Sequence, residues 1–198
     1  MKLIILGRDG ILNRYREDHV KSAAEWQPLE GALEAVARLN HAGWHVVVAT
    51  NQAGIGRGMI DMASVNAIHA HMTKLAQARG GRIDAVFFCP HTPEDGCDCR
   101  KPLPGMLLEV GRRYGVDLSQ VPMVSDTLRD LRAAQAAGCE PHLVLSGRAA
   151  SLDEAARRSL LEQVPQARVH DSLGAFVEHL LLRAPVATPT SAHVGGRG

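Results

Sequence analysis

Short apolar runs alternate with longer segments of helical periodicity along most of this chain. Each apolar run is too short for a helix and ends in polar or small residues, which is typical of strands buried on both faces. The segments between them repeat apolar residues at helical spacing. The predicted strands are 3–6, 46–50, 85–89, 123–126 and 143–145, and the predicted helices are 32–40, 63–79, 105–114 and 128–137.

This alternation of strand and helix predicts the fold class. A strand–helix–strand unit makes a right-handed crossover, which leaves its two strands parallel in one sheet. We therefore expect an α/β fold with a mainly parallel sheet. The weaker pattern after residue 148 predicts two more helices, 152–164 and 173–182, and a short edge strand, 167–170.

Polar and small residues follow the predicted strands. They occupy positions 8–10, 50–52, 89–101 and 125–127. Parallel sheets bind ligands beyond the carboxyl ends of their strands, near the point where the strand order changes. One sheet edge should therefore gather two carboxylates, a hydroxyl, an amide pair, a lysine and a group of cysteines.

Composition and charge exclude several classes of protein. Lys and Arg total 22 and Asp and Glu total 21, a formal charge of +1, which argues against a protein that binds the nucleic-acid backbone. No run approaches 18 apolar residues, and the N-terminus lacks the features of a signal peptide, so we expect no membrane contact and a cytoplasmic location. We expect a monomer with one domain over residues 1–183. The Pro- and Gly-rich tail, 184–198, is predicted to be disordered.

The clearest motif joins Cys89, His91, Cys97 and Cys99 within eleven residues. Three thiolates and one imidazole complete a tetrahedral shell for zinc, and a closed shell of this kind is structural. In a reducing compartment such clustering favours metal binding over the alternative, a coincidental cluster with a loop disulfide. Cys139 stands apart after a glycine and is interpreted as a small buried residue.

Four other candidates each have an ordinary structural interpretation. Asp9 precedes Gly10 and fits a turn, and Thr50 fits a hydroxyl at a strand end. Lys101 by default is a solvated lysine, and Asp126 fits the N-cap of the helix that follows it. Their joint position at one sheet edge, in this order, favours a functional site.

Taken together, these segments resemble the haloacid dehalogenase-like phosphatases. Within them the chain is most similar to the D-glycero-D-manno-heptose 1,7-bisphosphate 7-phosphatase group, with histidinol-phosphatase domains as close relatives. The resemblance covers residues 1–147 in collinear order, on segments 8–13, 50–58, 89–102 and 123–130. It implies a single Rossmann-like three-layer domain with a small zinc-binding loop insertion and no large cap domain. The implied activity is Mg²⁺-dependent hydrolysis of a sugar phosphate in the synthesis of heptose precursors of lipopolysaccharide.

The resemblance also implies roles for individual residues. In the family one aspartate attacks phosphorus, and a second, two residues later, acts as general acid and base. By position, Asp9 is the acid and base and gives a carbonyl to Mg²⁺, Asp126 is a carboxylate ligand of Mg²⁺, and Asp130 is a further candidate. Thr50 and Lys101 are the implied phosphate-binding pair. The implied substrate-binding residues are Arg8, Tyr15, Arg16, Glu17, Asp18, Asn51, Gln52, Ala53, Arg100 and Thr127.

The chain departs from the family pattern at the nucleophile, whose position falls on Gly7. Glycine offers no carboxylate to attack phosphorus or to bind Mg²⁺. Ile11, where the family usually has threonine, and Ser125, where it usually has glycine, are lesser departures. Loss of a covalent nucleophile commonly removes several orders of magnitude in rate, with residual catalysis from the remaining electrostatics.

Four interpretations remain open at this stage. The first is a working or engineered phosphatase in which residue 7 was altered. The second is a natural pseudoenzyme that binds a sugar phosphate or only keeps the fold. The third is a specificity for histidinol phosphate or another small phosphate on the same scaffold, and the fourth is a zinc loop that binds a partner protein. We favour the heptose bisphosphate phosphatase group, with catalysis impaired by Gly7.

Overall fold

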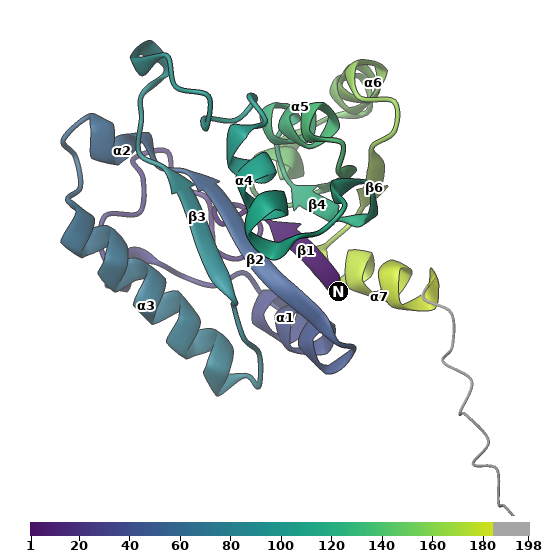
Figure 1. The fold of residues 1–198 in the computed structure, drawn as a ribbon, viewed down its shortest axis with the longest axis horizontal. Coiled ribbons are helices and arrows are strands. Elements are labelled where there is room, and N and C mark those ends of the chain that lie inside the picture. Colours follow the sequence, from purple (N-terminus) through teal and green to yellow (C-terminus); the bar gives the residue numbers. More distant parts are fainter. Residues whose placement is uncertain (184–198) are drawn as a thin grey trace, which may run out of the picture.

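A six-stranded sheet lies between two layers of helices in the computed structural model, which describes residues 1–183 (Figure 1). Every strand pair is parallel, and the strand order is β3-β2-β1-β4-β5-β6. The predicted α/β class with a mainly parallel sheet is thus confirmed. The strands are β1 (Lys2–Leu6), β2 (Trp44–Asn51), β3 (Ala85–Cys89), β4 (Pro122–Ser125), β5 (Glu140–Val144) and β6 (Arg168–His170).

The helices cover the two faces of the sheet because each buries one apolar stripe against it. On one face, α1, α3 and α7 share a core with the strands, and on the other face α4 and α5 do so. The sixth helix packs beside α5 and β5. The helices are α1 (Ala32–His41), α2 (Ala53–Gly56), α3 (Met62–Ala78), α4 (Gly105–Tyr114), α5 (Leu128–Ala137), α6 (Glu154–Gln163) and α7 (Leu173–Arg183).

Most element boundaries fall where the hydrophobic pattern predicts them. Strand β3 and helices α4 and α5 have the predicted bounds, and β6 is the predicted edge strand. Helix α6 begins two residues later than expected because Asp153 caps it, with its side chain accepting a hydrogen bond from the Ala156 N–H. The predicted tail, 184–198, lies outside the described residues.

The strand order fixes where a ligand can bind. The chain runs outward from β1 through β2 to β3, then returns to the other side of β1 as β4. The connections after β1 and β4 therefore leave the sheet in opposite directions and open a crevice between them. Residues 7–10 and 125–127 stand at the carboxyl ends of these two strands.

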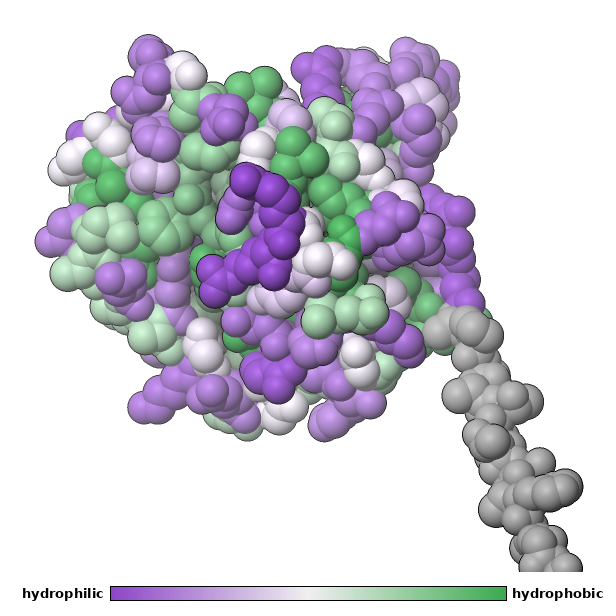
Figure 2. Space-filling model, viewed as in Figure 1, coloured by the Kyte–Doolittle hydropathy of each residue, from purple (hydrophilic) through white to green (hydrophobic). Residues whose placement is uncertain are grey.

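The face of the molecule seen in Figure 2 mixes hydrophilic and hydrophobic residues. The outer face of α6 is strongly hydrophilic (upper right in Figure 2), with exposed charges such as Glu154 and Arg158, which pair at 3.1 Å. Among residues 1–183, no helix combines the length and apolar character that a membrane span requires.

A group of histidines lies where α7 packs on the far edge of the sheet. His142 of β5 is buried, and its Nδ1 lies 3.0 Å from Nε2 of His170 in β6. The rings of His142 and Phe176 of α7 meet edge to face, with centroids 4.8 Å apart. Burial lowers the pKa of His142 to about 3, and the charge of His170 adds to the effect. Glu140 lies 3.7 Å from its Nε2 but is exposed enough for solvent to screen the attraction.

We expect this histidine to make the fold sensitive to acid. The pKa of His142 is lower in the folded chain than the usual value near 6.5, so between those values the unfolded chain binds more protons. Stability should therefore fall as the pH drops below about 6.5, with a loss of about 2 kcal/mol from this group at pH 5. Urea unfolding at pH 7, 6 and 5 measures the slope. His142→Leu should make this slope shallower, and an unchanged slope in that variant would contradict the assignment.

Candidate active site

A cavity of about 220 Å³ opens at the crevice between β1 and β4. Most of the residues predicted from the sequence line it, although they come from five separate segments of the chain. Asp18 does not line the cavity and instead pairs at the surface with Arg16 and Lys21. The predicted residues in the lining are Arg8, Asp9, Tyr15, Arg16, Glu17, Thr50, Asn51, Gln52, Ala53, Arg100, Lys101, Asp126 and Thr127.

The carboxylate of Asp9 is held by three side chains. Its Oδ1 accepts hydrogen bonds from Arg8 and from Asn13 at 3.0 Å, and its Oδ2 accepts one from Gln52 at 3.0 Å. Burial raises the pKa of Asp9, but the Arg8 charge and these hydrogen bonds outweigh it, so the pKa lies below its usual value. Gln52 also donates to the Thr50 hydroxyl at 2.8 Å, so its amide links Asp9, which follows β1, to the end of β2.

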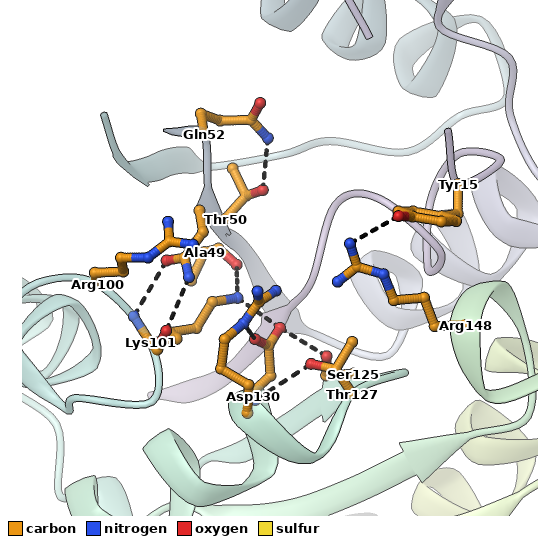
Figure 3. Close-up of polar contacts among 12 residues, drawn as sticks. Tyr15, Ala49, Thr50, Gln52, Arg100, Lys101, Ser125, Thr127, Asp130 and Arg148 are labelled. Carbon is orange, nitrogen blue, oxygen red and sulfur yellow. Dashed lines mark hydrogen bonds and ion pairs between the residues drawn. The ribbon is translucent and has the colours of Figure 1, made fainter. Parts of the chain in front are cut away.

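Lys101 is buried, with 2 % of its surface exposed, so its default interpretation as a solvated lysine is wrong. Its Nζ donates to the Ala49 carbonyl at 2.8 Å and to Asp130 Oδ2 at 2.7 Å (Figure 3). Ser125 donates to the same carboxylate oxygen at 2.7 Å. Burial alone raises the pKa of Asp130, yet the Lys101 charge and these bonds lower it to about 2. A buried cation is thus fixed beside the cavity.

The side chain of Asn51 clamps the backbone of this lysine. Its Nδ2 donates to the Lys101 carbonyl at 3.0 Å, and its Oδ1 accepts the Lys101 N–H at 3.2 Å. The two bonds hold the loop after β3 against the end of β2. The Asn51 amide therefore fixes the backbone of Lys101.

Two glycines cradle the carboxylate of Asp126. A Cβ on Gly10 or on Gly147 would lie 2.2 or 2.3 Å from Asp126 Oδ2, and both glycines have a positive φ. The same oxygen accepts the Arg148 N–H at 2.8 Å. Burial, as the largest effect, raises the pKa of Asp126 to about 6. A buried carboxylate held against the backbone, in a lining that also contains Asp9, suits a hard cation such as Mg²⁺.

The N-cap of α5 is Thr127, not Asp126. The Thr127 hydroxyl accepts the Asp130 N–H, and its backbone is extended as a cap requires. The capping interpretation of Asp126 is therefore wrong. Asp130, the further candidate for Mg²⁺, directs Oδ2 toward Lys101 and Ser125 instead.

A side chain at position 7 would need only a small shift of one neighbouring side chain. A Cβ there would lie 3.2 Å from Ile11 Cγ1 and 3.6 Å from both Ser125 Oγ and the Val124 carbonyl. Its backbone is outside the left-handed region, and its N–H donates to Val124 at 2.9 Å. The fold therefore does not require glycine at this position.

Arginines that the sequence interpretation missed complete the cavity. Arg57, Arg129 and Arg148 line it, and Arg148 donates to the Tyr15 hydroxyl at 2.8 Å while its guanidinium lies over the Tyr15 ring (Figure 3). Burial, followed by the charge of Arg129, lowers the pKa of Arg100. Arg148 follows the end of β5, so the rule that pointed to the other strand ends would have found it.

The predicted zinc ligands meet at one point beside the cavity. All four ligand atoms of Cys89, His91, Cys97 and Cys99 lie within 4.8 Å of one another. The Cys89 sulfur is 3.3 and 3.7 Å from those of Cys99 and Cys97, and His91 Nδ1 is 3.3 Å from Cys99. Tetrahedral zinc bonds of about 2.3 Å to sulfur and about 2.0 Å to nitrogen imply similar separations. The His91 carbonyl accepts a bond from Arg100 at 3.2 Å, which ties this loop to the cavity.

The sequence is 50% identical, over 93% of the chain and 100% of the relative, to D-glycero-β-D-manno-heptose-1,7-bisphosphate 7-phosphatase of Bordetella bronchiseptica. This chain belongs to the heptose-1,7-bisphosphate 7-phosphatase family of HAD-like hydrolases. The relative of that name in Pseudomonas aeruginosa is 45% identical, over 90% of this chain and 97% of its own length. The resemblance read from the motifs is confirmed, and the family's named members are phosphatases.

Solved structures of the family and family models agree with this assignment. The D,D-heptose 1,7-bisphosphate phosphatase of B. bronchiseptica, crystallised with magnesium and phosphate, matches with a TM-score of 0.86 at 50% identity, over 93% of this chain and all of its own. The Burkholderia thailandensis enzyme matches with a TM-score of 0.67 at 44% identity, over 91% and 99% of the two chains. The HAD-hydrolase-like model matches residues 98–176, and the polynucleotide kinase 3 phosphatase model matches residues 9–127.

Proposed function

We propose that this chain binds a heptose 1,7-bisphosphate and hydrolyses its 7-phosphate slowly, because Gly7 provides no nucleophile. The main support for this proposal is the charge of the residues that line the cavity. Seven cationic side chains and four carboxylates line it, an excess of three positive charges that suits a substrate with two phosphate groups. The family relatives named above act on a substrate of this class.

One phosphate would bind in the inner part of the cavity. The buried Lys101 and the Thr50 hydroxyl lie there, beside the Asp9 carboxylate that three side chains already hold. Positive charge and hydrogen-bond donors that are fixed before the reaction neutralise phosphoryl oxygens at little cost in reorganisation. Asp9 would move a proton between its carboxylate and the leaving oxygen, the role implied by its place in the first motif.

The second phosphate would bind at the outer arginines. Arg129 pairs with Asp130, whereas among the described residues no carboxylate pairs with Arg57, Arg100 or Arg148. Guanidinium groups bind phosphate through paired donors, so an unpaired cluster favours an anion rather than solvent. This arrangement supports a bisphosphate rather than a monophosphate as the substrate.

Asp126 and the Asp9 carbonyl would hold Mg²⁺, which would neutralise phosphate charge when bound. Because Gly7 removes one anionic ligand, we expect weak Mg²⁺ binding that tightens in Gly7→Asp, measured by calorimetry on the two proteins. Gly7→Asn is the matched control, since it adds a side chain of similar shape without charge. Equal affinities in all three would contradict a metal site beside residue 7.

Zinc would close the loop 89–99 as a structural ion. The purified protein should hold about one equivalent of zinc, and Cys97→Ser or Cys99→Ser should lose it, because a four-ligand shell leaves no spare donor. Cys139→Ser is the control, because that thiol is buried away from the cluster. Removal of zinc with a chelator should also weaken phosphate binding, because the His91 carbonyl of this loop accepts a hydrogen bond from Arg100. Metal-free protein with freely reactive thiols would contradict the site.

The cluster of Cys89, His91, Cys97 and Cys99 supports a reducing cellular compartment. All four cysteines are free in the structure. Thiolate ligands persist where disulfides do not form, so we place the chain in the cytoplasm, as a monomer acting on a small sugar phosphate of lipopolysaccharide precursor synthesis. The substrate class and location rest on the family assignment and on this chemistry together.

A panel of phosphate esters tests the proposal. Binding to the chain and phosphate release by Gly7→Asp are measured for a heptose bisphosphate, its 1-phosphate and histidinol phosphate. We expect the bisphosphate to bind best, and Arg148→Ala to reduce the preference for bisphosphate over monophosphate. Preference for histidinol phosphate, or equal binding of all three, would contradict the assignment.

A further inference from the structure

Arg8 is a buried cation in the wall of the cavity. Only 2 % of its surface is exposed. Its Nε and Nη2 donate to Asp9 Oδ1 at 3.3 and 3.0 Å, and its Nη1 lies 3.2 Å from Nε2 of His69. A buried guanidinium is costly unless its donors are paired, so both partners matter to its placement.

His69 reaches this arginine from the middle of α3, 61 residues along the chain. Its ring lies against Phe88 of β3, with centroids 5.8 Å apart. Arginine has donors and no acceptor, so the ring nitrogen that faces it must be unprotonated. Burial, followed by the Arg8 charge, lowers the pKa of His69 to about 4, which keeps the ring neutral at physiological pH. The contact therefore selects one tautomer, with the proton on Nδ1.

We propose that His69 is a positioning residue for the phosphoryl reaction: it anchors one end of the Arg8 guanidinium, whose other donors hold the Asp9 carboxylate toward the cavity. The guanidinium is a rigid planar fork, so fixing Nη1 also orients Nε and Nη2. This inference rests on the proposed function, because it matters only if Asp9 moves a proton during hydrolysis. It adds a residue of α3 that none of the sequence motifs includes.

Loss of the histidine should affect the reaction more than substrate binding. Without it, Nη1 would lack its acceptor, and the arginine would turn toward solvent or bound phosphate. Asp9 would keep Asn13 and Gln52 but lose its fixed cation. Displacement of a catalytic group by about 1 Å can cost about 100-fold in rate, so a partial displacement should be measurable.

The kinetic test uses Gly7→Asp as the parent. We expect His69→Ala to lower kcat about tenfold or more while KM changes less than about twofold. His69→Gln should recover kcat to within about threefold of the parent, because its amide oxygen can accept from Arg8. His71→Ala is the matched control, because it removes another histidine two positions further along α3. Its kcat should equal that of the parent. Equal losses in the Ala and Gln variants would reduce His69 to a packing residue and overturn the proposal.

A spectroscopic test decides the inference even if the parent proves inactive. Nitrogen-15 correlation spectra of the chain as it stands should show His69 at pH 7 with a protonated Nδ1 and an unprotonated Nε2. A protonated Nε2 would overturn the positioning role whatever the kinetics show. Absence of phosphate release by Gly7→Asp would instead contradict the proposed function, so the two failures remain distinguishable.

Discussion

Gly7→Asp should raise the rate of sugar bisphosphate hydrolysis at least about a hundredfold, since it restores the carboxylate that attacks phosphorus in this family. The structure leaves room for the change. A Cβ at residue 7 meets Ile11 Cγ1 at 3.2 Å, a contact that a small shift relieves, and Ser125 and Val124 lie 3.6 Å away. The gain should appear in kcat rather than in binding, because the groups proposed to hold phosphate, such as the buried Lys101, do not depend on residue 7 for their contacts.

Ground-state binding should be retained or even stronger in the chain as it stands. A carboxylate at residue 7 would repel the phosphate dianion beside it, and glycine removes that repulsion. Calorimetry with the bisphosphate and steady-state phosphate release therefore separate the two effects. Gly7→Asn should stay slow, and Asp9→Asn should abolish the gain in the Gly7→Asp background. Turnover by the unmodified chain at the rate of Gly7→Asp would mean that the nucleophile lies elsewhere.

The sheet and most of its helices were predictable because their signals are local. Each buried strand is an apolar run, and each long helix carries an apolar stripe, so periodicity alone located them. The four-residue helix α2 was not predicted, because it is too short to show a hydrophobic periodicity and because Gly54 and Gly56 disfavour a helix. Gly56 is required by close packing, since a Cβ there would lie 2.7 Å from the Pro90 carbonyl.

The site was predictable at the level of strand ends but not of side-chain partners. The order of the motifs pointed to Asp9, Thr50, Lys101 and Asp126, and all four line one cavity. Their partners depend on tertiary packing across long stretches of sequence. Burial of Lys101 follows from its contact with Asp130, 29 residues away, and no local pattern around either residue encodes that pairing. In the sequence, nothing distinguishes His69 from other histidines in helices, because its contact with Arg8 forms only in the folded chain.

Removing one member of the Lys101–Asp130 pair should destabilise the fold strongly. Both side chains are almost fully buried, and Nζ and Oδ2 are 2.7 Å apart. Breaking a buried ion pair from one side leaves an uncompensated charge, which commonly costs about 3–5 kcal/mol. We expect Lys101→Met to lower the free energy of unfolding by about this much, because Asp130 would keep only Ser125 and the more exposed Arg129. Urea titration at neutral pH measures the change.

The double variant Lys101→Met, Asp130→Leu separates stability from function. Replacing a buried ion pair by apolar residues of similar size is often neutral or stabilising, so the double variant should regain most of the stability lost by Lys101→Met. Phosphate binding should not return with it, because the cation beside Thr50 is still missing. Arg158→Ala, which breaks an exposed pair on α6, is the control and should change neither quantity appreciably. If the double variant binds phosphate as the unmodified chain does, Lys101 holds the loop after β3 in place and takes no part in binding the ligand.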